Sequence, residues 1–198
     1  MNTDRDPSTA SAATPARRSR RAQLAMVGAL LAVLFGGALG LYVWLQDYRE
    51  RMQHVGYPLH AFALPELHAP ERTLRVSDLR GEPFLLHSFA SWCPACAMGH
   101  EETRRLKERY RLRLIGYNLE DEREDALAWL QRKGDPYTRI AADRKGDIAL
   151  YGLRMYGTPF FVLVDAEGII RWRHQGTLTE DTIAQGLEPA LRAMGHLP

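Results

Sequence analysis

The two cysteines of this 198-residue chain lie three positions apart, in the segment WCPAC at residues 92–96. The apolar run 84–89 precedes them and a charged, helix-like stretch follows. Paired thiols between a strand and a helix are typical of proteins that exchange disulfides. A cysteine at the start of a helix lies beside unpaired backbone N–H groups and the positive end of the helix dipole, which favour the thiolate. We therefore expect Cys93 to attack a substrate disulfide and Cys96 to resolve the mixed disulfide.

Other uses of a cysteine pair fit this sequence less well. Structural zinc usually has four ligands, often as two cysteine pairs, and the chain has no second pair. His87, His100 and His174 match no common zinc spacing, so we expect no metal. A purely structural disulfide over so short a loop would remove little entropy from the unfolded chain. Peroxidase chemistry is disfavoured because the chain has no separate cysteine to meet the peroxide.

The N-terminal region predicts a membrane anchor. Residues 22–46 carry no charge, and a helix over the apolar residues 22–45 would be about 36 Å long, enough to cross a bilayer core of about 30 Å. Four arginines lie between residues 17 and 21, which by the positive-inside rule places residues 1–21 in the cytoplasm. A cleaved signal peptide is the alternative, but the apolar run is long for one and residues 42–45 offer no small-residue cleavage site.

We accordingly divide the chain into four segments: a disordered basic tail at 1–21, a transmembrane anchor at 22–46, a spacer at 47–58 and a periplasmic domain at 59–198. The tail holds five arginines and two aspartates, whereas the whole chain has a net charge of +2, so the rest is almost neutral. No basic field suggests nucleic acid. About 140 residues remain for the domain, enough for one hydrophobic core and too few for two.

Strand and helix signals alternate along this domain. The first strands are expected at residues 72–76, 84–89 and 112–117, and later ones at 160–164 and 169–174. Helices are expected after the cysteines as far as Tyr110, and at residues 122–133, 147–151 and 180–194. A βαβ unit followed by a ββα unit is the thioredoxin arrangement. The fold class is therefore α/β, a thioredoxin-like mixed central sheet flanked by helices and preceded by one transmembrane helix.

Three motifs carry a family resemblance: ASWCPAC at 90–96, YGTP at 156–159 and VDAEGIIR at 164–171. Together they resemble the membrane-anchored, periplasmic thioredoxin-like proteins, and among these the thiol:disulfide interchange proteins of cytochrome c maturation, called CcmG or DsbE. The WCPxC motif alone would indicate only the thioredoxin superfamily. The subfamily is indicated by weaker matches in the same order along about residues 55–195, namely 62–65, 117–118, 129–130, 134–137 and 171–176.

The resemblance implies a reductive activity. Members of this family keep the haem-attachment cysteines of apocytochrome c, or the maturation proteins that hold them, reduced in the periplasm. Their electrons come from an inner-membrane thiol transporter of the DsbD or CcdA kind, and no bound cofactor is needed because the dithiol is the reagent. A general periplasmic thiol oxidoreductase, or even an oxidant, remains the alternative. A copper-delivery protein is a third, disfavoured because such proteins favour three residues between the cysteines.

The resemblance also implies a substrate-binding role for residues beside the dithiol. In thioredoxin-like proteins the proline before the strand expected here at 160–164 is cis, so we expect a cis bond between Thr158 and Pro159. The backbone of Thr158 would then pair with an extended substrate segment. Trp92 is expected to form part of the same docking surface, with simple core packing as the alternative.

Two positions depart from the family pattern near the dithiol. Family members often have a glutamate three residues after the second cysteine and another directly after the cis-proline, where this chain has Gly99 and Phe160. An acidic groove would then be lost, or moved to Glu101, Glu120 or Asp121. Because nearby carboxylates raise the pKa of a thiol, the dithiol is expected to differ from that of a typical family reductant.

His87 is a third departure, six residues before the first cysteine. Thioredoxins have a buried aspartate at this position and the subfamily usually has an asparagine. We hypothesise that His87 lies beneath the dithiol and relays a proton to or from Cys96, because histidine titrates near neutral pH. The alternative is a buried histidine that is hydrogen-bonded to the backbone and has no catalytic part.

Overall fold

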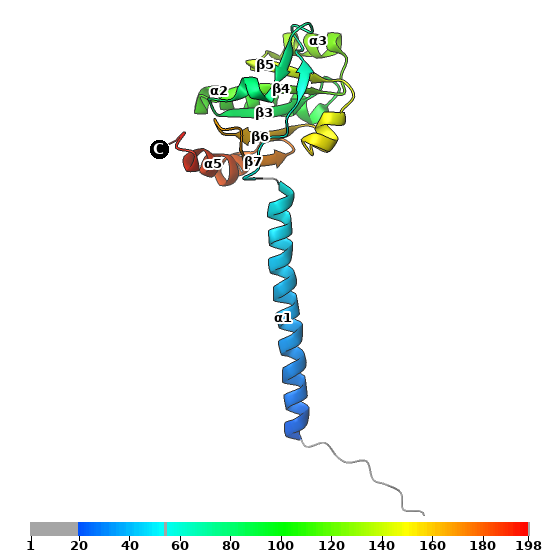
Figure 1. Cartoon of the computed structure of the whole chain (residues 1–198), viewed down its shortest axis with the longest axis vertical. Coiled ribbons are helices and arrows are strands. Elements are labelled where there is room, and N and C mark those ends of the chain that lie inside the picture. The colour runs from blue at the N-terminus through cyan, green and yellow to red at the C-terminus, as the bar shows by residue number, and fades with distance from the viewer. Residues whose placement is uncertain (1–19, 54, 198) are drawn as a thin grey trace, which may run out of the picture. The chain divides into compact units, whose positions relative to one another are not determined.

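The computed structural model of the protein describes residues 20–53 and 55–197. The disordered tail expected at the N-terminus lies, as far as residue 19, outside them. The described chain divides into two units, with the division between Arg49 and Glu50. The first contains most of helix α1, Arg20–Gln53 (Figure 1). Residues 22–45 of this helix are apolar and unburied, and long enough to cross a membrane. The helix also extends through the first residues of the predicted spacer.

The second unit is built on a five-stranded mixed sheet with the strand order β5-β4-β3-β6-β7 (Figure 1). Three strands are parallel: β3, β4 and β5. The other two, β6 and β7, are antiparallel to their neighbours. The bounds are Phe84–Phe89 (β3), Arg113–Leu119 (β4), Arg139–Asp143 (β5), Phe160–Val164 (β6) and Ile170–Gln175 (β7). This is the thioredoxin-like arrangement that the sequence predicted.

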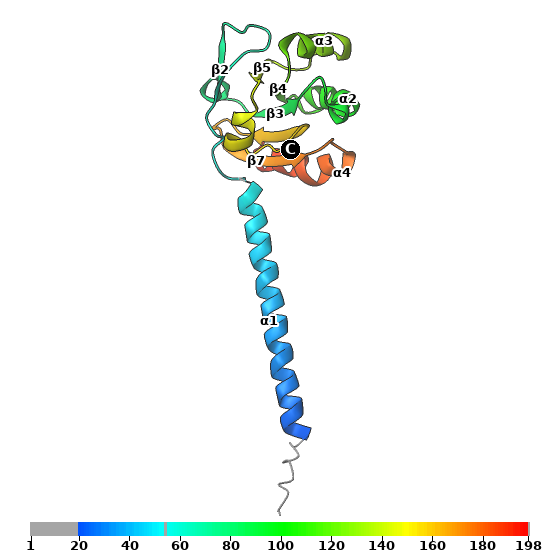
Figure 2. The ribbon, with the colours of Figure 1, turned by 90° about the vertical axis from the view of Figure 1, so that its right-hand side faces the viewer.

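Helices and a small hairpin cover the two faces of this sheet. Figure 2 shows α2, α3 and α4 on one side and β2 on the other. The hairpin consists of β1 (Ala63–Pro65) and β2 (Thr73–Arg75), followed by the short helix η1 (Val76–Leu79). The remaining elements are α2 (Pro94–Tyr110), α3 (Arg123–Lys133), η2 (Ile148–Gly152), α4 (Glu180–Thr182), η3 (Ile183–Leu187) and α5 (Glu188–Ala193).

Strand β3 divides the interior into two hydrophobic cores. All six of its residues are buried, and successive side chains point to opposite faces of the sheet. Leu85 and Phe89 pack in the core that contains both cysteines and residues of α2, α3 and α5. Phe84 and Leu86 pack in the second core, with the hairpin and η2. A strand buried on both faces reads as a continuous apolar run, which is why its bounds were predicted correctly.

The parallel strands determine where the cysteines lie. Because β3, β4 and β5 run in one direction, their carboxyl ends meet at one edge of the sheet. Helix α2 begins five residues after Phe89, at that edge. In open α/β sheets this is the edge at which ligands bind.

Two strands, β1 and β5, were missed by the sequence analysis. Residues 139–143 form β5, whose sequence RIAAD shows little β-branched or aromatic enrichment. Its place is set by backbone pairing with β4, in which Tyr117 lies opposite Ala141. Strand β1 has only three residues and pairs with β2. Long-range pairing of this kind leaves little local signal in the sequence.

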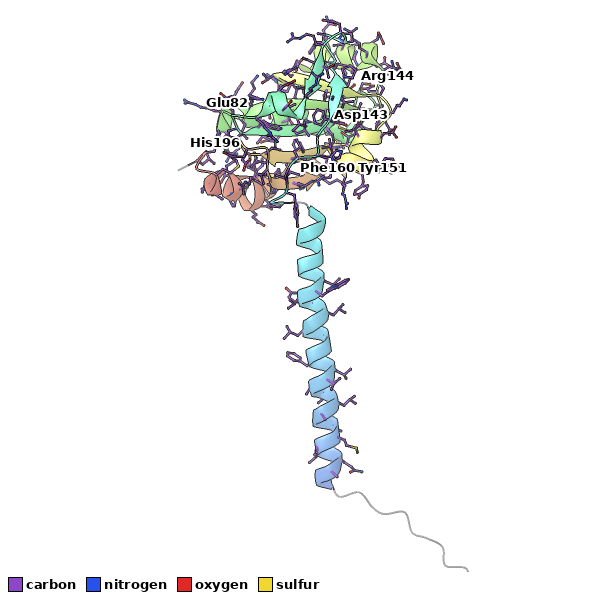
Figure 3. The ribbon with its side chains drawn as sticks, in the orientation of Figure 1. Glu82, Asp143, Arg144, Tyr151, Phe160 and His196 are labelled. Atoms are coloured by element: carbon purple, nitrogen blue, oxygen red, sulfur yellow. A yellow bond between two sulfur atoms is a disulfide. The ribbon has the colours of Figure 1, made fainter. Side chains whose placement is uncertain are left out.

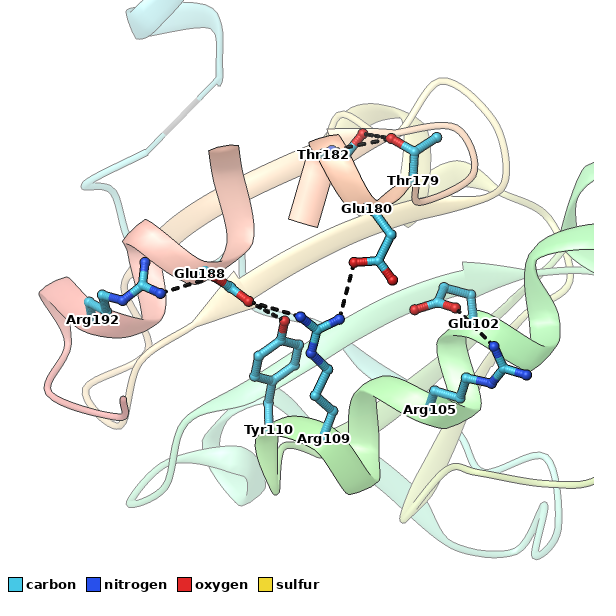
Figure 4. Close-up of polar contacts among 9 residues, drawn as sticks. All are labelled: Glu102, Arg105, Arg109, Tyr110, Thr179, Glu180, Thr182, Glu188 and Arg192. Atoms are coloured by element: carbon cyan, nitrogen blue, oxygen red, sulfur yellow. Dashed lines mark hydrogen bonds and ion pairs between the residues drawn. The ribbon is translucent and has the colours of Figure 1, made fainter. Parts of the chain in front are cut away.

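A polar network joins the far end of α2 to the C-terminal helices (Figure 4). The Arg109 guanidinium donates to Glu180 at 3.2 Å and to Glu188 at 3.3 Å, and the Tyr110 hydroxyl donates to Glu188 at 2.7 Å. Arg192 also donates to Glu188, at 3.0 Å. Exposed ion pairs contribute at most about 1 kcal/mol each. The buried side chains of α2, Leu106 among them, therefore contribute more to the position of the helix.

A paired substitution tests the buried sheet. Leu86 is fully buried in the second core, whereas Leu150 of η2 is 40% exposed. We expect Leu86→Ala to lower the free energy of unfolding by about 2–5 kcal/mol, because it removes buried methyl groups and leaves a cavity. The control, Leu150→Ala, should cost less than about 1 kcal/mol. Urea denaturation of the full chain in detergent micelles measures both, and equal losses would contradict the described core.

Candidate active site

Both cysteines lie at the start of helix α2. Cys93 is the N-cap residue, and its sulfur accepts the backbone N–H of Cys96 at 3.0 Å. Pro94 is the first helical residue, where the absence of an N–H leaves no donor unpaired. Cys93 and Cys96 form a disulfide, with their Cα atoms 5.3 Å apart. In the reduced state, the same N–H and the helix dipole would stabilise a thiolate on Cys93.

Thr158 contacts both sulfurs from the loop before β6. Its carbonyl oxygen lies 3.5 Å from the Cys93 sulfur, and its hydroxyl oxygen lies 3.3 Å from the Cys96 sulfur. The hydroxyl donates its hydrogen to the Ser88 carbonyl at 2.7 Å. Its oxygen is therefore directed to accept a hydrogen bond from a Cys96 thiol. This contact favours the protonated form of Cys96, so the two sulfurs occupy different electrostatic environments.

The expected cis bond is confirmed, between Thr158 and Pro159. Pro159 is buried and Thr158 is partly exposed. The side chain of Ser88, in β3, approaches the same loop, with its hydroxyl 3.3 Å from the Thr158 hydroxyl. The structure thus brings together four of the predicted site residues, Cys93, Cys96, Thr158 and Pro159.

Trp92, directly before the first cysteine, is 54% exposed and belongs to neither core. Its indole N–H donates to the carbonyl of Glu120 at 2.9 Å. This bond fixes one edge of the ring to the loop after β4 and leaves much of the side chain in solvent. The core packing considered as the alternative is therefore not what the structure shows.

Asp121 has a positioning role that the sequence analysis did not identify. Its carboxylate accepts the backbone N–H of Ser91 at 2.6 Å and the Ser91 hydroxyl at 2.7 Å. The side-chain amide of Asn118 donates to the same carboxylate at 2.9 Å. Asp121 is only 7% exposed and holds the loop before the cysteines, and it also lines a pocket beside Trp92 together with Glu120, Glu122 and Asp125. The sequence signal for this role was the position of Asp121 just after a central strand, whose carboxyl end lies at the edge of the sheet where the cysteines lie.

Of the other two candidates for an acidic groove, Glu120 lines this pocket and Glu101 does not. Glu101 is exposed on α2 and forms ion pairs with Arg104 and Arg105. Glu120 is exposed, and its backbone carbonyl also accepts a hydrogen bond from the Trp92 indole. None of the hydrogen bonds of the described residues joins a carboxylate to either sulfur.

His87 is buried in the core that contains the cysteines. It is 1% exposed, its ring stacks on Phe161 with centroids 4.2 Å apart, and Nδ1 lies 2.8 Å from the Tyr137 hydroxyl. Its other nitrogen, Nε2, has no hydrogen-bond partner among the described residues. Burial, with a smaller effect of His100, lowers the pKa of His87 to about 3. The ring is therefore neutral at physiological pH, and the expectation that His87 titrates near neutral pH is wrong because burial disfavours the charged form.

A second buried histidine, His100, lies one turn after Cys96 on α2. Its Nε2 donates to the carbonyl of Gly134 at 2.8 Å, and its ring lies edge-on to Trp129. Burial is the main cause of its lowered pKa. Nδ1 has no partner among the described residues. His87 and His100 thus place two uncharged nitrogens in the interior behind the dithiol.

The geometry supports dithiol–disulfide exchange. One sulfur is at a helix N-terminus, the other is behind it, and the pair can close a disulfide without moving the backbone. Among the described residues no group of three or more histidine, cysteine or acidic side chains could hold a metal ion. The cysteine pair at the start of α2 is the reactive group that the site presents.

Comparison with known proteins agrees with this chemistry. The model of the Redoxin family matches residues 54–187. The thiol:disulfide interchange protein DsbE of Xylella fastidiosa is 41% identical over 145 residues, which are 73% of each chain. The protein of the same name from Allochromatium vinosum is 38% identical over 172 residues, 86% of this chain and 91% of its own. That of Escherichia coli K12 is 35% identical over 136 residues, 68% and 72% of the two chains.

A solved structure shows the same architecture. The crystal structure of a putative thiol:disulfide interchange protein DsbE from Chlorobium tepidum superposes with a TM-score of 0.59 at 27% identity. The match covers 71% of this chain and 96% of that one. The fold, the cysteine pair at the start of α2 and these relatives give one conclusion. The chain belongs to the Redoxin family and, within it, to the DsbE thiol:disulfide interchange proteins, which are thioredoxin-like enzymes of cytochrome c maturation.

Proposed function

We propose that this protein is a membrane-anchored, periplasmic thiol:disulfide oxidoreductase that reduces disulfides of apocytochrome c or of its maturation partners. The observation that carries the proposal is the placement of Cys93 at the N-cap of α2, where its sulfur accepts the Cys96 N–H. This favours Cys93 as the nucleophile. The DsbE relatives support the pathway.

The reaction would proceed in two exchange steps. The Cys93 thiolate attacks one sulfur of a substrate disulfide, which forms a mixed disulfide and releases the other substrate sulfur as a thiolate. Cys96 then loses its proton and attacks the Cys93 sulfur, which releases the second substrate thiolate. Two electrons pass from the dithiol to the substrate, and the protein ends in the disulfide form. An inner-membrane thiol transporter of the DsbD or CcdA kind would reduce it again. No bound cofactor takes part.

Substrate binding would use the residues that surround the dithiol. The Thr158 carbonyl lies 3.5 Å from the Cys93 sulfur, so an extended peptide could pair with this backbone while its cysteine meets Cys93. Trp92 offers an exposed aromatic surface on the other side of Cys93. Pro159 would help to shape the loop that presents Thr158.

The proposed location follows from the N-terminal helix. The uncharged residues 22–46 would cross the inner membrane once, the basic residues 1–21 would stay in the cytoplasm, and the spacer and catalytic domain would face the periplasm. A tether confines the domain to a layer near the bilayer, which raises its effective concentration toward membrane-bound partners. This arrangement suits a dedicated pathway.

We also propose that His87 relays a proton to or from Cys96. It lies on the same face of β3 as Phe89, whose side chain packs in the core of the two cysteines. Nε2 of His87 has no hydrogen-bond partner among the described residues, so it is free to take a proton. Besides burial, His100, one turn after Cys96, lowers the pKa of His87, which supports a proton path through this part of the interior. Since the ring is neutral, it would accept the Cys96 proton only transiently, while Cys96 attacks.

A trapping experiment tests the proposed substrate class. We expect full-length protein with Cys96→Ala, expressed in its native membrane, to accumulate mixed disulfides through Cys93, because the resolving sulfur is missing. Mass spectrometry should identify apocytochromes, maturation proteins and a thiol transporter. The matched control, Cys93→Ala, should trap far less. Capture of unrelated secreted proteins instead would indicate a general thiol oxidoreductase and would contradict the dedicated role.

The relay is tested by His87→Asn. We expect the rate of disulfide exchange at neutral pH to fall about tenfold or more, because the proton of Cys96 loses its acceptor. The rate is followed together with the pH titration of thiolate absorbance. The control is His174→Asn, since His174 is half-buried and contacts the same Phe161 ring. Unchanged titrations and rates in a stably folded His87→Asn protein would end the proposal.

A further inference from the structure

A cation-lined pocket lies beside the loop that contacts the dithiol. It has a volume of about 290 Å³, and its lining includes three basic side chains and no acidic one. The basic residues are His60, Arg154 and Arg173. Exposed aromatic surface borders them, since Tyr151 also lines the pocket and is 77% exposed. A pocket of this composition favours an anionic group with some apolar surface around it.

The positive charge of Arg173 is not compensated. Its guanidinium lies 4.8 Å above the centre of the Phe160 ring and donates to the carbonyls of Leu153 and Arg154. Its Nε is buried and has no partner among the described residues. Burial, together with the nearby Arg154, lowers the pKa of Arg173. Arg173 therefore places a positive charge without a carboxylate partner beside a second cation.

Arg154 is exposed and available to a ligand. The ion pairs and side-chain hydrogen bonds of the described residues include no partner for its guanidinium. Elsewhere in the domain, arginines commonly pair with carboxylates, as Arg171 does with Asp165. Two neighbouring arginines without a carboxylate can bind one supplied by another molecule. Arginine suits this role because its planar donors match the two oxygens of a carboxylate.

The pocket is connected to the dithiol through the segment between η2 and β6, although its apolar lining belongs to the second core and the cysteines belong to the first. Arg154 precedes Thr158 by four residues, a span of at most about 14 Å. Phe160, beneath the Arg173 guanidinium, directly follows Pro159. Figure 3 shows Tyr151 and Phe160 toward the same side of the domain as Asp143, at the carboxyl end of β5, with Glu82 and His196 at the opposite side. A peptide paired with Thr158 would reach the pocket within a few residues of its reacting cysteine.

We propose that this pocket is a carboxylate subsite for the polypeptide substrate. It binds an acidic side chain about three to five residues from the substrate cysteine, and Arg154 and Arg173 are its specificity-determining residues. The inference rests on the proposed exchange activity and adds a sequence preference to it. A polypeptide is favoured over a lipid headgroup because the segment between η2 and β6 lines the pocket through Leu153 and Arg154 and contacts the sulfurs through Thr158.

The test compares peptide substrates. The reduced full chain, in a neutral detergent, is offered peptides with one internal disulfide and either glutamate or glutamine three to five residues from a cysteine, on either side. We expect the best glutamate peptide to have a KM about tenfold lower than its glutamine counterpart, with a similar kcat, since a charge-assisted hydrogen bond is worth that much or more. The preference should weaken as salt is added.

Matched variants assign the preference to the pocket. Arg154→Gln should reduce the tenfold preference to less than about twofold, whereas Arg132→Gln, at an exposed arginine of α3, should retain it. The rate at which the glutamine peptides are reduced should be the same for the unaltered chain and for both variants. If the glutamine peptides were not reduced at all, the exchange activity itself would be wrong.

Two results would overturn the subsite. One is the absence of any preference in the unaltered chain, or a preference that survives Arg154→Gln. The other comes from repeating the assay in nanodiscs of neutral or anionic phospholipid. The pocket would be assigned to lipid headgroups if three results were found together. Anionic lipid would alter the rate with a glutamine peptide, the Arg154→Gln substitution would abolish that effect, and no preference for glutamate peptides would exist.

Discussion

The hydrogen bond from the Cys96 N–H to the Cys93 sulfur is the interaction on which the site depends. It exists because α2 starts at Cys93, and α2 starts there because Pro94 suits the first helical position and β3 ends just before. The helix end supplies the N–H and the dipole that favour a thiolate. The remainder of the domain keeps this helix end at the edge of the sheet, facing Thr158.

Polar contacts on both sides keep the dithiol in place. Asp121 holds the loop before Cys93 through the N–H and hydroxyl of Ser91, and the Thr158 hydroxyl is directed by its bond to the Ser88 carbonyl. The result is a chemical asymmetry, because Cys93 accepts the backbone N–H of Cys96 while Cys96 has the Thr158 hydroxyl oxygen as an acceptor beside it; the Thr158 carbonyl lies farther away, 3.5 Å from the Cys93 sulfur. Exchange requires that difference, because one sulfur must attack while the other waits as a thiol.

Much of this arrangement could be predicted from sequence, and the reasons for the rest are physical. Strands β3 and β6 were predicted with correct bounds because burial on both faces makes them continuous apolar runs. The cysteine pair and Pro159 were identified from short motifs. Asp121, Tyr137 and the cations of the pocket were not, because their roles come from contacts between distant segments. His87 and Tyr137, for example, lie fifty positions apart, and their hydrogen bond leaves no local pattern.

The most direct test of the account is the reactivity of each sulfur as a function of pH. The reduced full chain would be treated briefly with iodoacetamide across a pH series, and modification of Cys93 and Cys96 would be quantified separately by peptide mass spectrometry. The account predicts that Cys93 reacts first, with an apparent pKa well below the ordinary thiol value of about 8.5, while Cys96 remains largely unmodified. Equal reactivity of the two sulfurs, or earlier modification of Cys96, would contradict it.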